Sequence, residues 1–257
     1  MLVLLSCAKT MSAVSKVKVP LTTIPRFQKE AAEIALQMSQ FSVDELERLL
    51  RVNAKIAVEN YKRYQAFHAE ATPELPALLA YTGIVFKRLN PKDFSAEDFG
   101  YAQEHLRLTS FCYGLLRPLD VIRAYRLEGD VVLPELGNQT LFSYWRSRLT
   151  DTFIEDIRSA GGILCNLASD EMKSLFDWKR VESEVRVVTP EFHVWKNGKL
   201  ATIVVYTKMS RGEMTRFILK NKIGNPEELK GFSWEGFEFD ESLSDEKKLV
   251  FINGMGE

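Results

Sequence analysis

Two short runs of apolar residues constrain the fold of this chain more than any other feature. Leu2–Leu5 and Ile163–Ala168 are too short for buried helices and are typical of buried β-strands. A third signal is Asn197-Gly198, which separates the apolar segments Phe192–Trp195 and Leu200–Tyr206 and predicts a β-hairpin. We therefore expect a sheet that contains buried strands.

Helix signals occupy much of the remaining chain. Three capping boxes predict helix starts, and they are Ser42 with Glu45, Ser95 with Asp98, and Ser210 with Glu213. With 257 residues, of which 46% are hydrophobic, the chain can bury a substantial core. We expect one mixed α+β domain that spans residues 1–257.

The segment Tyr101–Glu128 is unusual because it holds four arginines, three carboxylates, one histidine and three tyrosines among apolar residues. Its first part predicts a helix with apolar positions up to about Leu108. Gly114 and Pro118 interrupt that helix, so we expect Arg117 on a bend. The pattern alone leaves two interpretations open, an anion-binding segment or a solvated loop with internal ion pairs.

The formal net charge of −1 excludes a globally basic nucleic-acid binder but not a local basic face. Residues 48–63 contain five Lys and Arg against one Glu, and residues 208–222 show the same balance. Residues 235–246 contain six acidic side chains and no basic one. Positive and negative charge are therefore segregated along the chain.

The spacing of the cysteines indicates the redox environment of the protein. Cys7, Cys112 and Cys165 are far apart and form no CxxC pair, so we expect a reducing environment and no disulfide or zinc site. The opening MLVLLSC has no basic residue before a very short apolar run, which argues against a secretory signal. No run of eighteen apolar residues predicts a membrane span.

Three predicted strand ends carry hydroxyl groups, and two of them also carry a lysine. They are Ser6–Lys9, Asn166–Asp170 and Lys208–Glu213. Open α/β sheets bind ligands beyond the carboxyl ends of their strands, and helix starts favour anions. If these ends converge with Arg117, Arg123 and Arg126, they form a cationic cleft suited to phosphate. The alternative is that the serines only cap helices.

Common catalytic and metal-binding patterns are missing from the sequence. There is no GxSxG, Walker or GxGxxG motif, and His68, His105 and His193 are too scattered to predict a metal site. The candidate general acids or bases are carboxylates that would need burial beside the arginines, namely Glu128, Asp170 and Glu213. No cofactor is expected.

Residues 42–67 predict two short helices joined by a turn at Asn53. Lys55, Lys62 and Arg63 lie on the second helix. This outline is typical of a helix-hairpin-helix element, which grips DNA phosphates through backbone N–H groups and lysines. The usual glycine-hydrophobic-glycine turn is absent, and two amphipathic helices packed on a core are the alternative.

Five separated motifs together resemble the YaaA family of bacterial peroxide-stress proteins, in the same order and over essentially the full chain. They are LSCAKT, HLRLTSFCYGLLRPLDVIRAYRLE, NLASDE, YTKMSRGEMTRFI, and GFSWEGFEFDE followed by LVF. The resemblance implies a cytoplasmic bacterial protein of mixed α and β structure that is induced by peroxide and limits damage from free intracellular iron. It also implies DNA binding, double-stranded or branched, through a positively charged cleft and a helix-hairpin-helix element.

The resemblance extends to individual positions. It supports the Asn53 turn and Lys55 as nucleic-acid contacts, and Lys62 and Arg63 on the same predicted helix are candidates with them. By motif it places a further set in the cleft, namely Lys9, Arg117, Asp120, Tyr125, Arg126, Asn166, Ser169, Lys208 and Arg211. We expect a monomer with no membrane contact. A different class of function stays open, an enzyme acting on a nucleotide or another phosphorylated small molecule in the same cleft.

The chain departs from the family pattern at two places. Cys7 stands where the opening motif usually has proline, and Gly83-Ile84 stands where a glycine-acidic pair is usual. The first departure can loosen the loop that holds Lys9, and the second removes an acidic role at Ile84. Cys7 is interpreted as a buried inert cysteine or as a peroxide-sensitive thiol.

Overall fold

The core of the protein is an eight-stranded sheet with the order β11-β12-β9-β8-β1-β3-β4, in which β10 also pairs with β9. The computed structural model describes residues 1–196 and 198–254. The strands of this sheet are β1 (Leu2–Leu5), β3 (Leu106–Ser110), β4 (Gly114–Leu116), β8 (Ile163–Asn166), β9 (Arg186–Lys196), β10 (Lys199–Ala201), β11 (Phe237–Asp240) and β12 (Lys248–Asn253). Two small sheets pair β2 (Glu74–Pro76) with β5 (Val121–Arg123), and β6 (Val132–Leu133) with β7 (Gln139–Thr140).

The middle of the sheet is parallel. β1 pairs in parallel with both β3 and β8, β8 with β9, and β9 with β12. All four residues of β1 and all five of β3 are buried, as expected for parallel strands that are covered on both faces. The carboxyl ends of these five strands therefore meet at one edge of the sheet.

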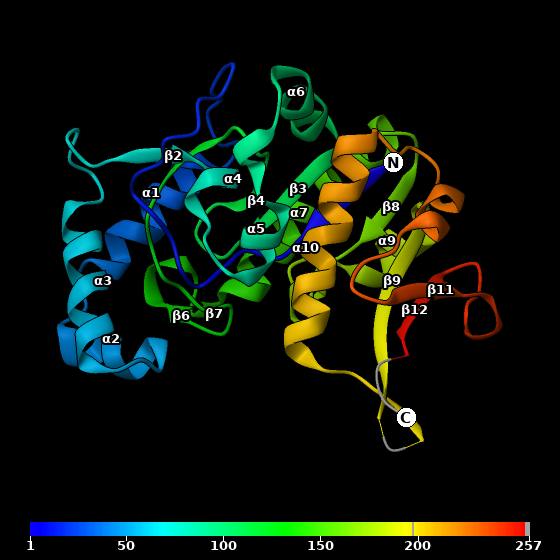
Figure 1. Ribbon diagram of the computed structural model, residues 1–257. Coiled ribbons are helices and arrows are strands. Elements are labelled where there is room, and N and C mark those ends of the chain that lie inside the picture. Colours follow the sequence, from blue (N-terminus) through cyan, green and yellow to red (C-terminus); the bar gives the residue numbers. More distant parts are fainter. Residues whose placement is uncertain (197, 255–257) are drawn as a thin grey trace.

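Helices cover both faces (Figure 1). The α-helices are α1 (Gln28–Met38), α2 (Val43–Leu50), α3 (Ala54–Ala66), α4 (Ala77–Ala80), α5 (Ile84–Leu89), α6 (Ala96–His105), α7 (Leu141–Ser159), α8 (Asp170–Lys173), α9 (Trp178–Glu184) and α10 (Val204–Asn221), and the 3₁₀-helices are η1 (Pro91–Asp93), η2 (Pro134–Leu136), η3 (Pro226–Gly231) and η4 (Glu241–Leu243). Helix α10 crosses the front of the sheet in Figure 1, whereas α7 and α9 lie behind it. Helices α1, α2 and α3 form a flank at one side. The predicted α+β class is confirmed.

Local sequence signals correctly located the starts of α2, α3 and α6. The capping boxes of Ser42 with Glu45 and of Ser95 with Asp98 are both formed, and they open α2 and α6. Asn53 caps α3 by accepting a hydrogen bond from the Ile56 amide. None of the described helices is long and apolar enough to cross a membrane.

The helix predicted to extend to about Leu108 ends earlier. It stops at His105, and β3 begins at Leu106 without a connecting loop. Leu106 and Leu108 fit both a helical and an alternating pattern, so periodicity could not decide between them. Pairing with β1 on one side and β4 on the other selects the strand.

The prediction of a helix start with a capping box at Ser210 is wrong. Strand β10 ends at Ala201 and α10 starts at Val204, so Ser210 lies inside the helix and is buried. The β-branched residues from Ile203 onward favoured a strand by propensity, but packing against α5 determines the outcome. A Cβ atom on Gly212 would lie 2.3 Å from the Val85 carbonyl oxygen, so this glycine lets α10 approach α5 closely.

The predicted β-hairpin is confirmed, although its turn is only partly described. Strands β9 and β10 pair antiparallel, with Leu200 opposite Trp195. Asn197 lies outside the described residues. Strand β9 runs from Arg186 to Lys196 and so extends beyond the predicted segment Phe192–Trp195, whereas β10 ends at Ala201 and is shorter than the predicted Leu200–Tyr206.

Candidate functional site

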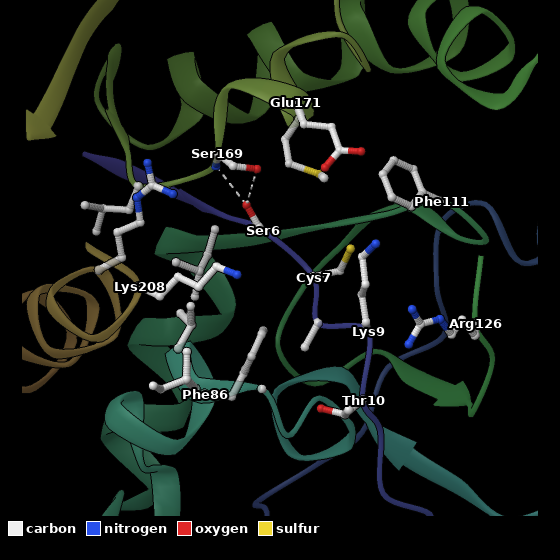
Figure 2. A pocket seen from close by; sticks show the side chains of 18 of the residues that line it. Ser6, Cys7, Lys9, Thr10, Phe86, Phe111, Arg126, Ser169, Glu171 and Lys208 are labelled. Carbon is white, nitrogen blue, oxygen red and sulfur yellow. Dashed lines mark hydrogen bonds between the residues drawn. The ribbon is translucent and has the colours of Figure 1, made fainter. Parts of the chain in front are cut away.

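A pocket of about 320 Å³ lies at the carboxyl ends of β1, β3 and β8 (Figure 2). The loop after β1, residues 6–10, forms one wall, and Gly83 and α5 form another. Residues after β3 and β8 and one side of α10 complete the pocket. The expected convergence of strand ends is therefore found, except that α10 contributes the middle of a helix instead of a strand end.

Two serines fasten the loop after β1 to the segment after β8. The Ser169 amide donates to Ser6 Oγ at 2.8 Å, and Ser6 Oγ donates to Ser169 Oγ at 3.3 Å. Ser169 precedes α8, but its side chain makes no capping hydrogen bond. These hydrogen bonds join the LSCAKT and NLASDE motifs, and Figure 2 shows the pair on the pocket wall.

Lys9 and Glu128 form a charged pair at the pocket. Lys9 Nζ donates to both carboxylate oxygens of Glu128, at 2.7 and 2.9 Å. The Glu128 side chain is 4% exposed, whereas that of Lys9 is 60% exposed. Arg126 is a second cation near this carboxylate, with Nη2 3.6 Å from Oε1. The buried Glu128 carboxylate therefore pairs with two cations.

Four basic side chains line the pocket, and Glu171 is the carboxylate among the lining residues. Lys9 and Arg126 approach from one side and Lys208 from the other (Figure 2). Arg211 lies one turn beyond Lys208 on α10. The Nε atoms of Arg126 and Arg211 are buried, and neither has a hydrogen-bond partner within the described parts of the chain. Burial also lowers the pKa of Arg211, although Asp170 opposes this shift.

Tyr125 belongs to a chain of hydroxyl groups behind the pocket. Its Oη lies 2.8 Å from Tyr81 Oη and 2.6 Å from Ser110 Oγ. Burial raises the pKa of both tyrosines well above the ordinary value. Both phenols are therefore neutral at physiological pH, and their hydroxyl groups stay hydrogen bonded to each other.

Cys7 also lines the pocket, with its backbone amide donating to Thr109 Oγ1 at 3.2 Å. Burial raises the pKa of the Cys7 thiol to about 12. The thiolate is the reactive form, so this environment favours the inert interpretation of Cys7 over the peroxide-sensitive one. Cys7, Cys112 and Cys165 are all free thiols.

Three of the nine residues that the motifs placed in the cleft lie outside the pocket lining, as does Arg123, which pairs with Glu74 at 3.0 Å. Arg117 and Asp120 pair with each other, with Nη2 2.9 Å from Oδ1, and Asp120 also accepts a hydrogen bond from Thr23 at 2.6 Å. Asn166 is buried at the end of β8, where Oδ1 accepts from the Ala168 amide at 3.2 Å. The other six predicted residues line the pocket, namely Lys9, Tyr125, Arg126, Ser169, Lys208 and Arg211.

Two of the three candidate catalytic carboxylates, Glu128 and Asp170, differ sharply in environment, and the third, Glu213, lies on α10 outside the pocket lining. Glu128 is buried behind Lys9 and Arg126. The Asp170 side chain is 92% exposed and pairs with Lys173 at 2.7 Å, a hydrogen bond that lowers the pKa of Asp170. The neighbouring residue Glu171 lines the pocket instead. Sequence reasoning missed Glu171, because a one-residue step at a helix start turns the side chain to another direction.

The predicted helix pair is formed by α2 and α3. Lys55 and Lys62 are exposed, while Arg63 pairs with Glu59 at 2.6 Å. Two contacts tie this pair to the chain segment that carries Arg126 and Glu128. These contacts are a bidentate ion pair of Arg51 with Asp130, at 2.6 and 2.9 Å, and a hydrogen bond from Tyr64 Oη to the Arg126 carbonyl at 2.5 Å. The helix-hairpin-helix assignment stays a prediction.

Two of the histidines make contacts within the fold. His105 Nδ1 contacts the Met1 carbonyl at 3.1 Å, and His193 Nε2 contacts Glu191 at 3.1 Å. Over residues 1–196 and 198–254, no group of three or more His, Cys, Asp and Glu side chains is placed to hold a metal ion.

Comparison with known proteins agrees with the motifs around the pocket. The model of the family described as "Peroxide stress protein YaaA" matches residues 1–243. The chain belongs to this family. It is similar to bacterial proteins named "UPF0246 protein": it is 98% identical over 257 residues to one from Bacteroides thetaiotaomicron and 78% identical over 257 residues to one from Bacteroides fragilis, in each case over the whole of both chains.

More distant relatives share the same full-length match. A UPF0246 protein of Crocosphaera subtropica is 38% identical over 253 residues, which cover 98% of this chain and all of the relative. Membership of the YaaA family gives the chain a general role in the response to hydrogen peroxide in bacteria. The five motifs that carried the resemblance therefore identified the family correctly.

Proposed function

We propose that this YaaA family member protects bacteria from peroxide by binding DNA, and that it thereby helps to limit damage from free intracellular iron. The observation that carries the proposal is the convergence of Lys9, Arg126, Lys208 and Arg211 on one pocket. These residues come from three distant parts of the sequence. Lysine and arginine side chains on phosphates supply most of the affinity of proteins for nucleic acid.

The arginines of the pocket favour an anionic ligand. A buried N–H group without an acceptor costs about 1–3 kcal/mol, and more when the group is charged. Arg126 and Arg211 each have such a group. A phosphate oxygen satisfies a guanidinium N–H and also neutralises its charge, so a phosphate in this pocket relieves both costs.

We propose that the helix pair of α2 and α3 is a second surface that contacts DNA. Lys55 and Lys62 on α3 are exposed and free to meet a phosphate backbone. The Tyr64 hydrogen bond joins α3 directly to the backbone of Arg126. A DNA molecule that contacts both α3 and the pocket would therefore meet two surfaces that are fixed relative to each other.

In this proposal, the protection against damage from iron is a consequence of DNA binding. The described residues contain no cluster of metal ligands, so the proposal does not assign iron storage to the protein. Iron that is bound to DNA produces damage at the DNA itself, and a protein that occupies phosphates competes for the same anionic sites. We expect a monomer to be sufficient for this role.

A phosphorylated small molecule is the second candidate ligand. The observation that favours it is burial: Glu128 and the Nε atoms of both pocket arginines lie below the protein surface. A free nucleotide reaches such groups more easily than a duplex does. In that case Glu128 is the candidate for proton transfer, because Asp170 faces solvent.

Fluorescence anisotropy with labelled duplex, branched and single-stranded DNA tests the first candidate. The proposal predicts binding that weakens steeply as the salt concentration rises. Lys55→Ala should lower the affinity and reduce the slope of log K against log salt by about one. Lys179→Ala is the matched control, because Lys179 is an exposed lysine on α9.

Two results would overturn the proposal in part or in full. An unchanged affinity for Lys55→Ala removes the helix pair from the interface. No binding of wild-type protein at low salt removes DNA as the ligand and leaves the phosphorylated small molecule.

A further inference from the structure

We propose that the pocket holds a single nucleotide unit, with the base against its apolar floor and the phosphate at its basic rim. This inference rests on the proposed function, since it specifies which part of a nucleic acid enters the pocket. The shared chemistry is a nucleoside monophosphate. The source is either a nucleotide turned out of a DNA strand or a free nucleotide, and the experiment below separates the two.

The polarity of the pocket changes from floor to rim. The buried lining residues are mostly apolar, namely Leu5, Phe86, Phe111, Tyr125, Leu127, Leu167 and Met172. The exposed lining residues are polar or charged, namely Lys9, Thr10, Glu171 and Lys208. A nucleotide has the same order of groups, from a flat apolar base through the sugar to a charged phosphate.

Two aromatic rings that line the pocket pack against other aromatic rings. Phe86 packs against Tyr81 with ring centroids 5.2 Å apart, and Phe111 meets Phe142 edge-on at 5.5 Å. Figure 2 shows Phe86 and Phe111 on different sides of the pocket. Aromatic side chains are the usual platform for a nucleobase in proteins that bind single strands or extruded bases.

The phosphate is placed beside the two arginines that line the pocket. Arg126 and Arg211 each carry a buried Nε–H group that has no acceptor within the described chain. Arg126 lies in the segment between β5 and β6, whereas Arg211 lies on α10 together with the exposed Lys208. One monophosphate offers enough oxygens for donors on two sides.

Glu171 limits how much negative charge fits. Its carboxylate lines the pocket between Lys208 on one side and Lys9 and Arg126 on the other (Figure 2), and it can accept a hydrogen bond from an amino or hydroxyl group of the ligand. The same carboxylate repels a second or third phosphate. The volume of about 320 Å³ is also at the lower end of the roughly 300–1,000 Å³ found for ligand pockets. The pocket therefore suits a monophosphate better than a triphosphate.

The test has two arms that use the full chain. In the first, deoxyadenosine monophosphate, deoxyadenosine, inorganic phosphate and deoxyadenosine triphosphate are titrated by calorimetry. The monophosphate should bind at least tenfold more tightly than any of the other three. In the second, duplex DNA with one 2-aminopurine in an unpaired position is titrated while anisotropy and 2-aminopurine fluorescence are recorded together. Binding should raise the fluorescence, because the base leaves the stack.

Variants connect both arms to the pocket. Arg211→Met removes the N–H donors at similar size and should weaken monophosphate binding at least tenfold. Ile84→Trp fills the pocket from α5 and should abolish the fluorescence rise even if Arg211→Met fails to fold. Lys179→Ala is the control that should change neither reading.

The outcomes distinguish this inference from the proposed function. DNA binding without a fluorescence rise and without monophosphate binding overturns the nucleotide pocket and leaves DNA binding intact. Monophosphate binding without DNA binding supports the pocket with a free nucleotide as its source and overturns the proposed function. The absence of both overturns both.

Discussion

The two edges of the parallel sheet use arginine in opposite ways. At the amino edge, Arg107 of β3 donates through Nε to Asp156 of α7 at 2.7 Å and through Nη1 to backbone carbonyls of residues 103 and 106. At the carboxyl edge, Arg126 and Arg211 keep buried Nε–H groups that meet no acceptor in the described chain. The same residue type joins strand to helix at one edge and lines a pocket at the other.

This difference shows that the partners of a charged group indicate its role better than the charge itself does. Arg107, Arg117 and Arg123 all belong to the segment Tyr101–Glu128, and each has a carboxylate partner within the fold. Their charges are neutralised and stabilise the structure. Arg126 Nη2 lies 3.6 Å from Glu128, whereas Lys9 Nζ lies 2.7 Å from the same carboxylate. Arg126 is therefore the more weakly paired of the two cations and can also bind a ligand.

The largest expected effect is at the amino edge. The side chains of Arg107 and Asp156 are 9% and 12% exposed, so Asp156→Ala leaves a buried guanidinium without its carboxylate. We expect a loss of about 3 kcal/mol in the free energy of unfolding, measured by urea denaturation. The control is Asp151→Ala on the same helix, where the partner Arg180 is exposed and no measurable loss is expected.

The pH dependence of this loss identifies its cause. Burial alone would raise the pKa of Asp156, but hydrogen bonds and charge from Arg107 and Arg26 outweigh burial and hold the pKa below its ordinary value. A carboxyl with a depressed folded pKa stabilises the protein above its unfolded pKa of about 4, and this stabilisation disappears as the pH falls through the folded pKa. Wild type and Asp156→Ala should therefore converge in stability in acid. A difference that does not depend on pH would assign the loss to packing.

The next effect concerns the pocket wall. With a pKa of about 12, Cys7 should react with iodoacetamide at pH 8 more than about a hundredfold more slowly than free cysteine does. Mass spectrometry of the alkylated protein measures this rate. Alkylation of Cys7 at the rate of free cysteine would show that the carboxyl edge holds a reactive thiolate.

Gly212 tests whether the close approach of α10 to α5 stabilises the protein. Gly212→Ala places a methyl group against the Val85 carbonyl and should cost about 1–3 kcal/mol in stability, while it shifts the helix that carries Lys208 and Arg211. Gly100 of α6 is the matched control, since a Cβ there meets no atom within 4 Å. Gly100→Ala should stabilise the protein by roughly 0.5–1 kcal/mol. Equal stability of the two variants would mean that α10 does not need its close approach to α5.

Sequence patterns predicted those parts of the fold that local chemistry determines. The apolar runs of β1 and β8 and the capping boxes at Ser42 and Ser95 are signals that a few neighbouring residues decide. The start of α10 was missed, because Ile203, Val204 and Val205 favour a strand until the contact between Gly212 and α5 is known. Strand β3 was missed for a similar reason, since only its neighbours β1 and β4 exclude a helix.

The site was predictable as a set of residue types but not as an arrangement. Six of nine predicted cleft residues line the pocket, because the motifs place charged or hydroxyl groups where strands end. Arg117 and Asp120 were not separable from the others, since their mutual ion pair depends on the bend at Pro118. The choice between Asp170 and Glu171 depends on the direction of side chains in a short helix, which the sequence does not determine.

Lys208→Ala tests most directly whether the carboxyl edge of the sheet binds the phosphates of DNA. The Lys208 side chain is exposed at the pocket, so its removal should leave the urea denaturation curve unchanged. In anisotropy titrations over several salt concentrations, we predict a loss of DNA affinity of about three- to tenfold and a salt slope lower by about one, with Lys179→Ala unchanged. An affinity and a salt slope equal to those of wild type would contradict the assignment of phosphate binding to this edge.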